Sequence, residues 1–106
     1  MIIGVPKEIK ADENRVSLLP FAVEKLTNLN CKVLVEKNAG LGSGYSDENY
    51  INCGATIIED ASDLFNDSDM IVKVKEPQKS ELEYIKKDQI IFTYFHFAAD
   101  KDLTDA

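Results

Sequence analysis

The sequence predicts an α/β fold with a parallel β-sheet and helices on both of its faces. Short apolar runs of strand length alternate with segments in which apolar residues recur at helical spacing. One run, Met70–Val74, is almost continuously apolar, as in strands that are covered on both faces. Alternation of this kind is typical of parallel sheets whose strands are joined by helical crossovers.

Five strands are expected, at residues 2–5, 32–36, 55–58, 70–74 and 90–94. A helix is expected to begin at Pro20, since proline lacks the N–H that would be unpaired at that position. Ser46 should cap a short helix that Gly54 ends. A helical turn is predicted over residues 61–65, and a capping box formed by Ser80 and Glu83 predicts a helix over residues 81–86. A last helix should begin at Asp100.

Composition limits the classes of function. The chain has 106 residues, enough for one small domain, and a net charge of −7 with 44% apolar residues. An acidic chain does not suit a nucleic-acid surface or an anionic membrane.

Cys31 and Cys53 lack the spacing of zinc ligands and are interpreted as free thiols. With no signal sequence and no transmembrane stretch, a cytoplasmic protein is expected, and the helix that begins just before residue 106 suggests a truncated domain.

Three residues at expected strand exits suggest a site for a small 2-oxo or 2-amino acid. In an open parallel sheet, ligands bind beyond the carboxyl ends of the strands. Arg15 follows the first strand, Lys75 the fourth and His96 the fifth. Arginine can hold a carboxylate through two hydrogen bonds, lysine adds a charge and a donor, and histidine exchanges protons near neutral pH.

Each of these residues also has a structural interpretation. Arg15 and Lys75 could be solvated surface charges, and Lys73 competes with Lys75, because strand alternation places both lysines on the side of Ile71. His96 lies between two phenylalanines and could be a hydrogen-bonded structural residue. The glycines of the segment 39–44 do not match the dinucleotide-binding fingerprint, so that segment is interpreted as a flexible turn, and no cofactor-binding residue is assigned in this chain.

Several motifs resemble one family in order and over essentially the whole chain. The segments 3–8 (IGVPKE) and 13–16 (ENRV) are similar to the start of the alanine dehydrogenases and the nicotinamide nucleotide transhydrogenases. The segments 39–44 (AGLGSG), 54–55 (GA) and 72–77 (VKVKEP) continue the likeness. Lys75 and the segment 92–100 around His96 resemble the alanine dehydrogenases more than the transhydrogenases. A transhydrogenase subunit and a binding module without catalysis are the alternatives.

The resemblance implies the Rossmann-like, N-terminal substrate-binding domain (residues 1–106) of an enzyme that interconverts L-alanine and pyruvate plus ammonium. Arg15 is similar to the residue that holds the substrate carboxylate, Lys75 to a catalytic lysine that also contacts the substrate, and His96 to the catalytic acid/base. Glu8 and Tyr94 match positions that line the substrate pocket. NAD would be held by a Rossmann domain absent from this chain, and the enzyme would be a hexamer; no metal is implied. The isolated chain is expected to be inactive.

Overall fold

The computed structural model describes residues 1–94, which form a five-stranded, all-parallel sheet with the strand order β3-β2-β1-β4-β5. The strands are β1 (Ile2–Val5), β2 (Lys32–Glu36), β3 (Thr56–Ile58), β4 (Met70–Lys73) and β5 (Ile90–Thr93). The α-helices are α1 (Pro20–Asn28), α2 (Asp47–Asn52) and α3 (Ala61–Asp67). Two 3₁₀ segments, η1 (Leu41–Ser43) and η2 (Lys79–Tyr84), complete the described elements.

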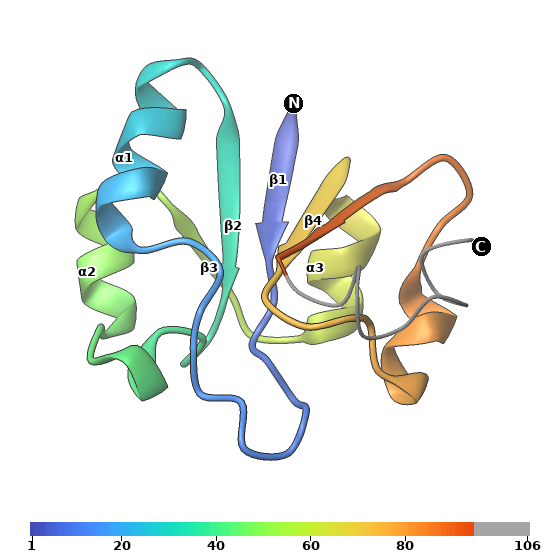
Figure 1. Cartoon of the computed structure of the whole chain (residues 1–106). Helices are drawn as coiled ribbons and strands as arrows, with labels where there is room; N and C mark the ends of the chain where they lie inside the picture. Colours follow the sequence, from blue (N-terminus) through green and yellow to red (C-terminus); the bar gives the residue numbers. More distant parts are fainter. Residues whose placement is uncertain (95–106) are drawn as a thin grey trace.

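Helical elements lie on both faces of the sheet, as predicted (Figure 1). Side chains alternate along β2: Val33 and Val35 join the core under α1 and α2, whereas Leu34 joins the core under α3. Leu64 and Phe65 of α3 are completely buried against that second face. The sheet is therefore the middle layer of three, and this confirms the fold class expected from the sequence.

Most predicted elements are present with small changes of boundary. Pro20 opens α1, and Ser46 caps α2, where its side chain accepts a hydrogen bond from the Asn49 backbone N–H. α3 is a true helix of seven residues, longer than the predicted turn. The glycine segment 39–44, predicted as a flexible turn, contains η1. The helix expected from Asp100 lies outside the described residues.

The predicted helix over residues 81–86 is wrong in both its start and its type. The structure has the 3₁₀ segment η2, which begins at Lys79 after Gln78. Gln78, and not Ser80, is the N-terminal partner: its backbone N–H donates to Glu81 Oε1 at 2.8 Å. The physical reason is that Glu81 points inward, where its second oxygen pairs with buried Lys73.

The strand order places a reversal beside β1. The chain moves from β1 through β2 to β3 on one side, and then crosses to β4 and β5 on the other side. In open α/β sheets such a reversal opens a crevice at the carboxyl ends of the strands. The loop of residues 6–19 leaves β1 at this point and extends beyond the sheet edge (Figure 1).

Candidate active site

Glu8 connects the exit of β1 to the exit of β4. Its side chain is buried, with one oxygen accepting the Val74 N–H at 3.0 Å and the other accepting the Lys75 N–H at 3.2 Å. Both backbone groups lie just beyond β4, where no further strand pairing uses them. Glu8 therefore fixes the backbone that carries Lys75.

Lys73 lies between two carboxylates below the site. Its side chain is completely buried, and Nζ lies 3.2 Å from Glu8 Oε1 and 3.3 Å from Glu81 Oε2. A buried ammonium is tolerated only when it is paired and hydrogen-bonded. This ion group joins the β1 exit, β4 and η2, so Lys73 is an internal structural residue and not a surface rival of Lys75.

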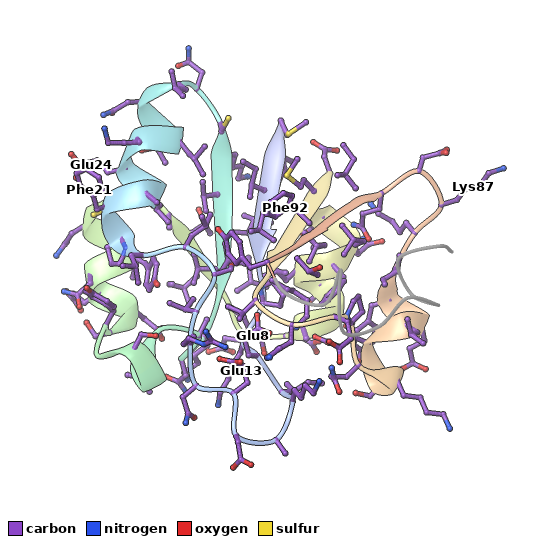
Figure 2. The ribbon with its side chains drawn as sticks, viewed as in Figure 1. Glu8, Glu13, Phe21, Glu24, Lys87 and Phe92 are labelled. Carbon is purple, nitrogen blue, oxygen red and sulfur yellow. The ribbon has the colours of Figure 1, made fainter. Side chains whose placement is uncertain are left out.

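Glu13 brings Arg15 and Lys75 together. The Arg15 guanidinium donates from Nε to Glu13 Oε2 at 2.9 Å and from Nη2 to Glu13 Oε1 at 2.9 Å. Lys75 Nζ lies 4.0 Å from Glu13 Oε1. Hydrogen bonds from the Arg15 side chain lower the pKa of Glu13 to about 2, and the same contact raises the pKa of Arg15. Figure 2 shows Glu8 and Glu13 close together below the end of β1.

The glycine segment holds the backbone on both sides of Arg15. Ser43 Oγ accepts the Val16 N–H at 3.2 Å and donates to the Asn14 carbonyl at 3.4 Å. A Cβ on Gly42 would collide with the Asn14 carbonyl, so the loop of residues 6–19 can approach only a glycine there. The segment 39–44 thus supports Arg15 through packing.

A pocket of about 200 Å³ opens between these two segments. Its lining combines the charged side chains of the first loop with the glycine segment: Lys7, Glu8, Glu13, Asn14, Arg15, Asn38, Ala39, Leu41 and Gly42. Pockets for drug-sized ligands begin at about 300 Å³, so this one suits a smaller molecule. Arg15 on the lining can hold a small anion through two hydrogen bonds, whereas Lys75 is not among the lining residues.

The remaining predicted site residues lie elsewhere or outside the described range. Tyr94 follows β5, and its hydroxyl donates to the Ser17 carbonyl at 3.0 Å, while the Ser17 hydroxyl donates to the Val72 carbonyl at 2.7 Å. Tyr94 therefore ties the first loop to the sheet and is not among the residues that line the pocket. His96 lies outside the described residues.

The internal partners of the predicted cations were not expected from the sequence. Glu13, Ser43 and Glu81 were given no role in a site, and Lys73 was considered only as an alternative to Lys75, although each holds a predicted residue or its support. One signal was present for Lys73: a lysine inside a strand that is covered on both faces must be buried and needs carboxylate partners. Glu13 offered no comparable signal, because a glutamate in a loop is ordinarily solvated.

Residues 1–94 contain neither a metal-binding cluster nor a membrane-spanning helix. Within this range no group of three or more histidine, cysteine, aspartate or glutamate side chains is arranged to hold a metal ion. None of the helices in the same range is long and apolar enough to cross a membrane. Cys31 and Cys53 are free thiols, as predicted.

The fold and site define a class of protein: an open parallel α/β domain with an arginine and a lysine gathered at the reversal point of the sheet. Comparison with known proteins narrows this class. Residues 4–106 match the family model described as "Alanine dehydrogenase/PNT, N-terminal domain". The chain belongs to this family.

Relatives and solved structures show that the chain is more similar to alanine dehydrogenases than to a transhydrogenase. The chain is 52% identical over its whole length to an alanine dehydrogenase of Methanococcus maripaludis and 50% identical to that of Bacillus subtilis. A solved L-alanine dehydrogenase matches 98% of the chain with a TM-score of 0.89 and 45% identity. A transhydrogenase from Sinorhizobium meliloti matches 90% with a TM-score of 0.83 and 32% identity. The chain spans 28% of each of these proteins, and the family model that it matches describes an N-terminal domain.

Proposed function

We propose that this chain is the substrate-binding domain of an enzyme that reversibly deaminates L-alanine to pyruvate and ammonium. The observation that carries the proposal is the meeting of Arg15 and Lys75 at Glu13, beside a small pocket at the reversal point of the sheet. Relatives that share about half of the residues are named alanine dehydrogenases, which agrees with this chemistry.

The proposed roles follow from the chemistry of each side chain. Arg15 would hold the substrate carboxylate through its planar fork, and Lys75 would donate to the carbonyl oxygen of pyruvate and stabilise the charge that develops there. His96 would exchange protons with the reacting carbon–nitrogen and carbon–oxygen centre. Glu8 lines the pocket and holds the Lys75 backbone, and Tyr94 ties the first loop to β5.

NAD does not fit the described residues. The glycine segment 39–44 packs against the first loop, and four of its backbone N–H groups already donate to nearby carbonyls: those of Ala39, Leu41, Ser43 and Gly44. We propose that a separate Rossmann domain of the full-length protein would hold NAD, which would take up the hydride that leaves the α-carbon of L-alanine. The full-length protein would be a cytoplasmic hexamer whose partner is the small-molecule substrate.

The test is an assay of the full-length protein that contains this chain. L-Alanine and NAD should give NADH, with pyruvate and ammonium as products in equal amounts. The transhydrogenase alternative predicts hydride transfer between two nicotinamide nucleotides without alanine. Absence of alanine-dependent NADH formation, with or without that transfer, overturns the proposal.

The assigned role of His96 is tested in the same assay. The variant His96→Ala should lose two to four powers of ten in turnover, roughly the contribution of a general acid/base. Near-normal turnover would remove His96 from the proposed chemistry while leaving the substrate assignment intact.

A further inference from the structure

Glu13 is a buried carboxylate that the proposed reaction has not yet used. We propose that Glu13 is a positioning residue that holds the Arg15 guanidinium and the Lys75 ammonium together as one anion-binding pair. This inference rests on the proposed function, because the anion is taken to be the carboxylate of pyruvate or L-alanine. Glu13 itself would not touch the reacting atoms.

The contact geometry fixes the guanidinium in a plane. Two parallel hydrogen bonds of 2.9 Å join Nε and Nη2 of Arg15 to the two oxygens of Glu13. Paired contacts of this kind set the orientation of an arginine as well as its distance. A third bond, from the Arg15 backbone N–H to Glu13 Oε2 at 3.0 Å, ties the same carboxylate to the main chain.

The Glu13 carboxylate is more deeply buried than the two cations that it contacts. The Glu13 side chain is 5% exposed, whereas those of Arg15 and Lys75 are 57% and 26% exposed. The carboxylate therefore lies beneath the two cations and leaves their outer parts accessible. A carboxylate that merely occupied the place of the substrate would have to move away when the substrate binds. Glu13 is instead held in place, because its side chain accepts the Arg15 backbone N–H and its own backbone N–H donates to the Lys10 carbonyl at 3.0 Å.

Charge explains why such a residue is needed. Arg15 comes from the loop after β1 and Lys75 from the exit of β4, and the two like charges repel each other. Glu13 Oε1 contacts both cations and so offsets that repulsion. Without this carboxylate, we expect the Arg15 side chain to sample several rotamers and to separate from Lys75, which weakens binding of an anion that needs both.

The experiment measures pyruvate affinity and steady-state kinetics of the full-length protein with Glu13→Gln, Glu13→Asp and the control Glu83→Gln, an exposed glutamate of η2. Glu13→Gln should raise the KM and Kd for pyruvate roughly tenfold, the scale of one hydrogen bond to a charged group, with a smaller effect on kcat. Glu13→Asp, which keeps the charge, should recover part of the loss, and Glu83→Gln should match the wild type.

A double-mutant cycle separates positioning from general destabilisation. In an Arg15→Ala background, Glu13→Gln should weaken pyruvate binding by much less, to about twofold, because the residue it acts through is gone. Urea midpoints of all variants show whether each one is folded.

Three results would overturn the inference. An equal loss in both backgrounds indicates a merely structural Glu13. Unchanged affinity in Glu13→Gln shows that the cations hold their positions unaided. Tighter pyruvate binding in Glu13→Gln would show that the Glu13 carboxylate competes with pyruvate for the cations. Failure of the proposed function is a different outcome, since the wild-type protein would then form no NADH from alanine.

Discussion

Arg15 is well placed to bind an anion because the Glu13 side chain beneath it holds the guanidinium in position. An arginine on an exposed loop loses much conformational freedom when it binds, and this entropy opposes binding. In this protein Glu13 has already ordered the guanidinium through two hydrogen bonds, and a third joins the same carboxylate to the Arg15 backbone N–H. At the residue scale, the site therefore consists of cations that are preorganised by buried carboxylates. Glu13 holds the Arg15 side chain, and Glu8 holds the Lys75 backbone.

The pairing of Glu13 predicts a loss of stability in acid. Its pKa lies at about 2 in the folded protein, against 4.5 for an unperturbed glutamate, because Arg15 donates to the charged form. Because the pKa of Glu13 is lower in the folded protein than in the unfolded chain, its ionised carboxylate stabilises the folded protein at pH values above 4.5. This stabilisation is lost as the pH falls from 4.5 toward 2. The difference in urea midpoint between the wild type and Glu13→Gln should therefore shrink over that range. A difference that stays constant with pH would contradict the ion pair as its source.

Two segments far apart in the sequence form the pocket at the scale of elements. The loop after β1 carries Arg15, and the segment 39–44 after β2 supports it through Ser43 and Gly42. Because the strands are parallel neighbours, both loops leave the sheet at the same edge. Lys73 adds a third connection from below, through Glu8 to the first loop and through Glu81 to η2.

The variant Gly42→Ala tests this support. A methyl group would meet the Asn14 backbone and lie 2.9 Å from the Asn14 Cβ, so the loop must move, at a cost of about 1–3 kcal/mol as for other overpacked sites. Pyruvate affinity should fall with stability. Gly44→Asn is the matched control: a Cβ there meets nothing within 4 Å, but the φ of 89° strains any side chain, so this variant should lower the urea midpoint without lowering pyruvate affinity. If Gly42→Ala lowers the urea midpoint but leaves pyruvate affinity unchanged, the segment does not position Arg15.

The whole molecule presents a sheet with uneven cover. α1 and α2 cover the β2–β3 side of one face, while Ile90, Phe92 and Tyr94 of the β5 region are between 42% and 49% exposed. Figure 2 labels Phe92 near the middle of the view, on β5, the strand that pairs with β4. The chain also spans only 28% of its relatives, so most of the proposed enzyme lies outside it.

The 106-residue chain alone should therefore form no NADH from L-alanine and NAD, whereas the full-length protein should do so. The reason is that the described residues hold the proposed substrate-binding cations but no dinucleotide site. Both samples are assayed at equal concentration, with circular dichroism to show that the short chain is folded. Turnover by the folded short chain would contradict the division of labour proposed between the two parts.

Local patterns in the sequence determined the elements of the fold. Apolar runs placed all five strands, and Pro20, Ser46 and Gly54 placed the ends of two helices, because capping and strand alternation depend on near neighbours. The rule for strand exits also brought Arg15 and Lys75 to one edge, where the structure has them. The resemblance to the family, carried by motifs along the whole chain, was confirmed.

Tertiary structure alone decided which charges face each other. Glu8 and Lys73 are 65 residues apart and meet only because β1 and β4 are neighbours in the sheet, an order that no local pattern specifies. The start of η2 was misplaced for the same reason, since the inward turn of Glu81 depends on a buried lysine from another strand. Burial determines whether a charge is solvated or must be paired, and burial is a property of the assembled layers and not of any single segment.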